Sequence, residues 1–120
     1  MIPIFIVDWE YCQLGELPMD LGHMVAELYK CWVFKNLDEA KWLIEGLAAG
    51  YGCFDDDLAF HTALYAGSIV VVSATMPLVL WGSEAQGQQM LRVAKELVLR
   101  AWHKDRAWFE ASDLACLFGN

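Results

Sequence analysis

Residues 4–22 read IFIVDWEYCQLGELPMDLG, and this stretch decides how the rest of the chain is interpreted. Four apolar residues, Ile4 to Val7, run directly into Asp8. A continuous apolar run of this kind is typical of a strand that is covered on both faces. The sequence therefore predicts a short strand or hairpin over residues 2–9, ending in a carboxylate.

The segment after this strand is predicted to be a loop followed by a helix. Gly15 and Pro18 favour the loop, and Asp20 is suited to cap a helix over residues 20–34. Apolar residues recur in that range at helical spacing, namely Leu21, Met24, Val25, Leu28 and Trp32.

Two further helix starts carry the capping-box pattern, in which a polar cap precedes Glu or Gln by three residues. The first is NLDE at residues 36–39, before a predicted helix over residues 37–50. The second is SEAQ at residues 83–86, before a predicted helix over residues 84–110. With the stretch described next, these patterns predict a mainly helical chain.

The stretch from Leu58 to Trp81 contains no Asp, Glu, Lys or Arg and is long enough to cross a bilayer. Its scattered polar side chains, and the absence of a flanking basic cluster, favour instead a buried core helix over residues 57–80. The three acids at residues 55–57 suit the start of that helix. A single-span membrane protein is the alternative interpretation, and we expect no membrane partner.

Length and composition narrow the class of protein. The 120 residues predict one domain over residues 1–120. The formal net charge of −8 argues against a nucleic-acid partner. The four cysteines lack the spacings of a zinc site, and no secretory signal precedes the strand. We therefore expect reduced thiols and a cytoplasmic location.

Asp8 has a placement that suits metal binding. A carboxylate at the end of a buried strand, entering a glycine-containing loop, is a recurrent way to hold Mg²⁺. The strand fixes the backbone, and the crevice at its end leaves room for phosphate oxygens to complete the octahedron of ligands.

The segment IVDWEYCQLGELPMDLGHMVAELY, residues 6–29, resembles the C-terminal lobe of the aminoglycoside phosphotransferase and choline kinase family. In that family a strand ends in an Asp that binds Mg²⁺, a loop with a Gly follows, and another Asp opens a helix. The resemblance implies that Asp8 holds Mg²⁺ and that Gly15 and Asp20 brace the site. Glu10 could contact the metal or its water shell.

The resemblance also implies a fold class and an activity. The fold would be a mainly α, helical C-terminal-lobe fragment of a kinase-like α+β fold. The activity of the parent protein would be ATP- and Mg²⁺-dependent phosphorylation of a small-molecule hydroxyl. An aminoglycoside, choline, a sugar, an amino acid and a protein hydroxyl all stay open as substrates.

The rest of the catalytic machinery is missing from this sequence. Phosphoryl transfer needs a cover over the phosphates, a Lys that contacts them, a base for the hydroxyl and a further metal ligand. In the resembled family these lie upstream, and no His-x-Asp…Asn loop precedes Asp8 here. We expect a fragment with no catalytic residue of its own, inactive alone, that binds neither Mg²⁺ nor ATP tightly.

The predicted strand would also lack neighbours, which leaves its edges open. We therefore expect self-association through residues 2–9. A non-enzymatic helical interaction module, in which Asp8 is incidental, is the alternative function.

Overall fold

The computed structural model describes residues 2–52, 54–76 and 83–119, and the prediction of a mainly helical chain is confirmed over these ranges. No strand occurs among them. The helices are α1 (Leu17–Lys35), α2 (Asp38–Tyr51), α3 (Asp56–Thr75), α4 (Glu84–Trp102) and α5 (Arg106–Glu110), with 3-10 turns at Trp9–Tyr11 and Ala115–Phe118.

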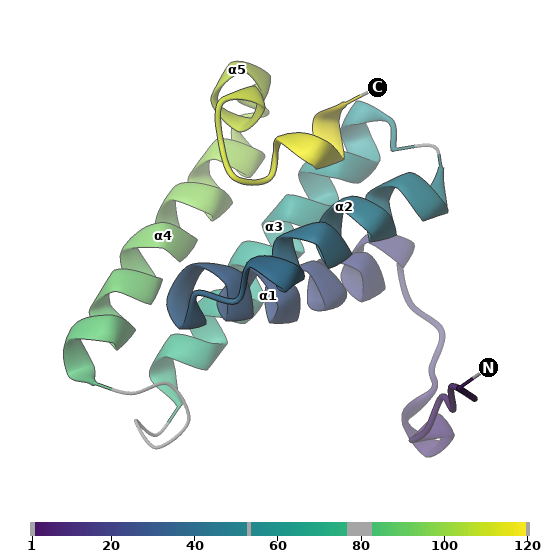
Figure 1. The fold of residues 1–120 in the computed structure, drawn as a ribbon. Coiled ribbons are helices and arrows are strands. Elements are labelled where there is room, and N and C mark those ends of the chain that lie inside the picture. Colours follow the sequence, from purple (N-terminus) through teal and green to yellow (C-terminus); the bar gives the residue numbers. More distant parts are fainter. Residues whose placement is uncertain (1, 53, 77–82, 120) are drawn as a thin grey trace.

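Helix α3 is the centre of the fold and packs against both α1 and α4 (Figure 1). Burial on two sides explains why its sequence carries so few charges. The side chains that face the neighbouring helices are mostly small, namely Ala59, Phe60, Thr62, Ala63, Ala66, Gly67, Val70 and Ser73. A helix in such a position must be apolar around most of its circumference.

Two glycines let the three central helices approach closely. A Cβ added at Gly22 of α1 would lie 2.5 Å from the Cβ of Tyr65 and 2.9 Å from the carbonyl oxygen of Thr62. A Cβ at Gly67 of α3 would lie 2.8 Å from a methyl group of Val98 on α4. Both contacts are shorter than van der Waals packing permits, so the crossings depend on the absence of a side chain.

The charge-free stretch folds as a helix that ends earlier than predicted. Helix α3 covers residues 56–75 rather than 57–80, and residues 77–82 lie outside the described part of the chain. Within that part, α3 alone is long and apolar enough to span a membrane, and 44% of its most apolar window is buried against other helices. Its contacts with α1 and α4 agree with the interpretation as a core helix.

The strand predicted over residues 2–9 is not formed. Residues 2–8 have no regular structure, and residues 9–11 make a 3-10 turn. The segment leads away from the helices (Figure 1), and Ile4 and Phe5 are 91% and 80% exposed. A strand needs a neighbouring strand to accept and donate its backbone hydrogen bonds. The described residues offer none, so the apolar pattern has no sheet to join.

The predicted capping box at residues 36–39 is also absent. Asn36 ends α1 instead, with its backbone in the left-handed region at φ 56°, and its N–H donates to the carbonyl of Cys31. Asn adopts this conformation more readily than most residues, which suits it to a helix C-terminus. The predicted capping box of Ser83 and Gln86 does form, with both of its hydrogen bonds present.

The last predicted helix, over residues 84–110, is interrupted. Helix α4 ends at Trp102, Lys104 adopts a left-handed backbone at φ 53°, and α5 starts at Arg106. Asp105 caps α5 by accepting a hydrogen bond from the Trp108 N–H. The turn brings Phe109 back onto the helices, where it is fully buried and stacks on Phe118.

Candidate functional site

Asp8, Gly15 and Asp20, the three residues that the sequence pattern implicates, line one cavity of about 320 Å³. The cavity lies between the N-terminal segment and the start of α1. Its other lining residues are Ile6, Val7, Trp9, Cys12, Gln13 and Met19. Glu10 does not line it. The structure therefore brings together three of the four predicted site residues.

Asp8 has an unusual backbone conformation. Its φ and ψ are 65° and 34°, in the left-handed region. This region costs a non-glycine residue about 1–2 kcal/mol, with Asp and Asn among the residues that tolerate it best. At Asp8 the chain bends from the extended segment into the turn at Trp9–Tyr11. Strained positions of this kind cluster at functional sites.

Asp20 does not cap the helix that follows, contrary to prediction. Helix α1 starts at Leu17, with Glu16 as the cap residue and Pro18 in the first turn. Proline is tolerated there because the first helical N–H groups lack partners within the helix. The Glu16 carboxylate accepts a hydrogen bond of 3.1 Å from the Tyr65 hydroxyl of α3. Asp20 is left exposed in the first turn, where the helix dipole favours a carboxylate.

Gly15 lies in the loop between the turn and α1. A Cβ at this position would lie 3.1 Å from the terminal methyl of Met19, which is the flexible end of a side chain. Because Met19 could move aside, packing among the described residues only weakly requires a glycine at position 15.

The site offers incomplete ligands for a divalent cation. Two carboxylates lining one cavity are oxygen donors of the type that Mg²⁺ prefers. Among the described residues, no three His, Cys, Asp or Glu side chains are grouped so that they could hold a metal ion. The donor set fits Mg²⁺ in kind, and an octahedral ion would need further oxygens from phosphate, water or other protein residues.

Each of the three acidic residues 55–57 has a structural role at the start of α3. Asp55 caps α3 by accepting a 2.8 Å hydrogen bond from the Leu58 N–H. Asp56 pairs with Arg106, and Asp57 with Lys104 at 3.2 Å. Those two ion pairs tie the start of α3 to the α4–α5 turn, which the sequence pattern did not predict.

Lys30 is a second feature that periodicity alone missed. Its side chain is buried between α1 and α3, and its Nζ donates to Ser73 Oγ at 2.7 Å and to Glu27 Oε1 at 2.8 Å. The sequence held one indication of this contact. Ser73 is a polar residue inside the charge-free stretch, and a buried Ser needs a hydrogen-bond partner on a neighbouring helix. The hydrogen bonds offset the cost of burying the ammonium group.

Comparison of the sequence with known proteins finds a similarity to a phosphotransferase. No protein-family model matches the chain, and no solved structure matches it significantly. The chain is 32% identical over 101 residues to the phosphotransferase FrzJ of Cladobotryum sp. The match covers 84% of this chain and 26% of FrzJ, so the chain spans about a quarter of that relative. The similarity is consistent with a fragment of a phosphotransferase-family protein.

Proposed function

We propose that this chain is the C-terminal part of an ATP- and Mg²⁺-dependent small-molecule phosphotransferase with a kinase-like fold. The observation that carries the proposal is the similarity to FrzJ over most of the chain. The shared cavity of Asp8, Gly15 and Asp20 supports it, because the resemblance to the aminoglycoside phosphotransferase and choline kinase family implicates those same residues. The parent protein would act inside the cell on a small-molecule hydroxyl.

Asp8 is the proposed Mg²⁺ ligand. The left-handed bend lets its carboxylate line the cavity at the point where the chain changes direction. Asp20 adds a second acidic residue to the cavity lining, and two negative charges beside one cavity favour a cation there. When bound, Mg²⁺ would supply positive charge that offsets the negative charge of the transferred group. Glu10, outside the cavity, would at most contact the ion's water shell.

Mn²⁺ titration followed by electron paramagnetic resonance tests the metal assignment on the chain as it stands. We expect weak binding that falls in Asp8→Asn, which keeps a residue able to adopt the left-handed backbone. Asp20→Asn should weaken it less. Asp38→Asn is the matched control, because Asp38 is an exposed acid in the first turn of α2. Equal Mn²⁺ binding in the wild type and Asp8→Asn would refute the assignment.

Activity gives the second test. The chain alone should not transfer phosphate from ATP, since the groups that cover and position the nucleotide are not in its sequence. A longer protein that contains it, preceded by a His-x-Asp…Asn loop, should phosphorylate a hydroxyl compound. Its turnover should fall roughly 100-fold or more in Asp8→Asn. Turnover by this chain alone that Asp8→Ala abolishes would overturn the proposal of an inactive fragment.

An interaction module is the second candidate function, and the exposed segment favours it. Ile2, Ile4, Phe5, Ile6 and Val7 are all more than two-thirds exposed, which is costly for a segment that meets only water. Pairing of this segment with another copy would cover it. Sedimentation should then show concentration-dependent dimers that Ile6→Lys dissociates. A monodisperse monomer at high concentration would exclude self-association through this segment.

A further inference from the structure

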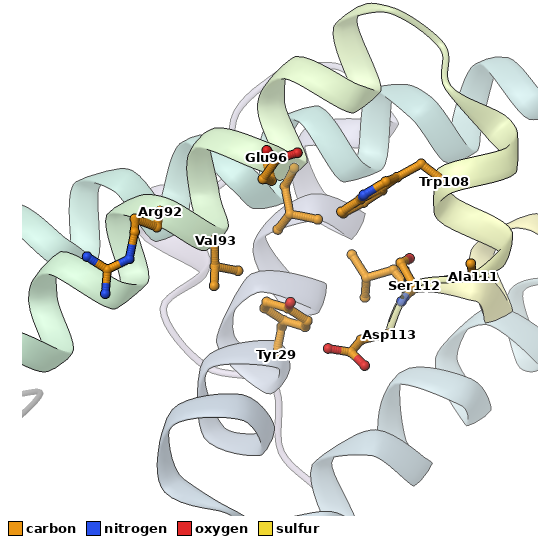
Figure 2. A pocket seen from close by; sticks show the side chains of 10 residues that line it. Tyr29, Arg92, Val93, Glu96, Trp108, Ala111, Ser112 and Asp113 are labelled. Carbon is orange, nitrogen blue, oxygen red and sulfur yellow. Dashed lines mark hydrogen bonds between the residues drawn. The ribbon is translucent and has the colours of Figure 1, made fainter.

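A second cavity, of about 490 Å³, lies between α1, α4 and the segment that follows α5 (Figure 2). We call it the Tyr29 pocket. Its lining residues are Tyr29, Arg92, Val93, Glu96, Leu97, Trp108, Ala111, Ser112, Asp113 and Leu114. Its volume is within the range of small-molecule sites, which are mostly apolar with a few convergent polar groups.

The Tyr29 hydroxyl points into this pocket without a partner. Tyr29 is only 5% exposed, yet no described residue forms a hydrogen bond with its hydroxyl. Burial, and then the charge of Asp113, raise the pKa of this hydroxyl well above its ordinary value. The group is therefore neutral at pH 7, with an oxygen free to accept a hydrogen bond and an O–H free to donate one. Among the described residues, Thr62 Oγ1 is the one fully buried side-chain polar atom without a partner, so the Tyr29 oxygen is open to water through the pocket and to a ligand that enters it.

The charges around the pocket favour a cation. Asp113 lies beside the Tyr29 ring in Figure 2 and forms no ion pair with any described residue. Glu96 is already paired with Arg100, with 3.0 Å between Oε2 and Nε. Arg92 lies at the edge, and its guanidinium is directed away from Tyr29. Asp113 is therefore the unneutralised charge nearest the hydroxyl, in a protein whose formal net charge is −8.

Apolar side chains surround this polar pair. Leu97 and Leu114 are buried in the wall, and the half-buried indole of Trp108 lies across the pocket from Tyr29. These groups offer surface to the apolar part of a ligand, while the Arg100 guanidinium already lies over the Trp108 ring, 5.7 Å from its centroid.

The Tyr29 pocket is separate from the Asp8 cavity. The two share no lining residue. Tyr29 lies nine residues after Asp20 on α1, which is about 14 Å along the helix axis at 1.5 Å per residue. A ligand in the Tyr29 pocket would therefore not be positioned by the residues proposed to hold Mg²⁺.

We propose that the Tyr29 pocket binds a protonated primary amine that carries an apolar or aromatic body. Asp113 is the counter-ion, and the Tyr29 oxygen accepts one of the ammonium hydrogens. The body of the ligand packs between Trp108 and Leu97. This site is separate from the Asp8 cavity, and the inference does not depend on the proposed function.

The probe for the test is 2-phenylethylammonium chloride, titrated into the ¹⁵N-labelled chain at constant ionic strength. The reporter is the indole N–H resonance of Trp108, assigned from its loss in Trp108→Phe. We expect a saturable shift of this resonance. The neutral analogue 2-phenylethanol has the same ring and chain, and it should bind about tenfold more weakly because it cannot pair with a carboxylate.

Three variants assign the contacts. Asp113→Asn should lower the affinity for the ammonium probe about tenfold and leave that for 2-phenylethanol unchanged. Tyr29→Phe keeps the ring and should lower the affinity for the ammonium probe several-fold. Glu39→Gln removes another exposed carboxylate, from the first turn of α2, and should have no effect. Asp113 is exposed, so its replacement should leave the helical circular dichroism intact.

Three results would overturn the inference. One is the absence of a saturable shift at Trp108. Another is equal affinity for the amine and the alcohol. The third is an Asp113→Asn variant that binds the amine as tightly as Glu39→Gln does.

Discussion

Residues 4–7 and residues 58–75 of helix α3 are both apolar and contain no Asp, Glu, Lys or Arg, yet the first are exposed and the second are mostly buried or half-buried. Helix α3 satisfies its backbone hydrogen bonds within itself, so it needs only side-chain contacts, which α1 and α4 supply. Residues 4–7 would satisfy theirs only in a sheet, and no described residue provides a second strand. The same composition therefore leads to opposite outcomes, because a strand depends on a partner and a helix does not.

The largest expected effect comes from one substitution made in both regions. Phe60→Ala in α3 should lower the free energy of unfolding by about 3–5 kcal/mol, because Phe60 is buried against Phe109 and Phe118. Phe5→Ala should change it by less than about 0.5 kcal/mol, because Phe5 is exposed. Urea unfolding of both variants measures the difference. Similar losses would mean that the N-terminal segment is packed in solution.

A smaller effect is expected where the helices cross. Gly22→Ala should destabilise the protein by roughly 1–3 kcal/mol, since the new Cβ meets Tyr65 and the backbone of Thr62. Gly46→Ala, at an exposed position of α2 where an added Cβ has nothing within 4 Å, should instead stabilise the protein by roughly 0.5–1 kcal/mol. Thermal unfolding distinguishes the two signs. A neutral Gly22→Ala would show that the α1–α3 crossing is looser than described.

The smallest expected effect is on the stability of the protein at acid pH. It depends on charged groups at the α4–α5 turn rather than on buried side chains. The Trp108 N–H and the Arg100 guanidinium donate to Asp105 and lower the pKa of its carboxyl below its ordinary value of 3.8. A lowered pKa in the folded state means that the contribution is complete above pH 4 and is lost as the pH falls further. Asp105→Asn should therefore flatten the stability profile below pH 4.

Urea midpoints at several pH values, compared with those of Asp38→Asn, check this prediction. Asp38→Asn removes one acid from a helix start where no described residue forms an ion pair with Asp38. An identical acid profile in both variants would contradict the role of Asp105.

The sequence was sufficient to predict the helices because their signals are local. Hydrophobic spacing marked α1, and the Ser83 capping box marked the start of α4. The break at Lys104 was missed, because the apolar spacing continues through it and Asp105 reads equally well as a helix surface residue. Its function as a cap follows from Phe109 folding back onto Phe60, which is a tertiary contact.

The two candidate sites also differ in how far their residues could be predicted from the sequence. Asp8, Gly15 and Asp20 are close in sequence, so a local motif could implicate all three. The residues of the Tyr29 pocket come from α1, α4 and the segment after α5, and no spacing rule relates Tyr29 to Asp113. They come together because α1 and α4 both pack against α3 and the chain turns back after α5. Glu10 was implicated by proximity to Asp8 along the chain, and the turn at Trp9–Tyr11 places it outside the cavity.

The position of α3 between α1 and α4 also limits which substitutions the sequence can accept during evolution. Ala66 and Gly67 are adjacent in the chain and meet different helices, Ala66 facing Gly22 and Gly67 facing Val98. A larger side chain at either residue would need a compensating substitution in a different helix, α1 for Ala66 and α4 for Gly67. A single substitution to a larger residue is therefore disfavoured at both positions. A saturation library should accept almost nothing larger at these two positions. At residues 4–7 it should accept polar residues freely, unless a binding partner keeps them apolar.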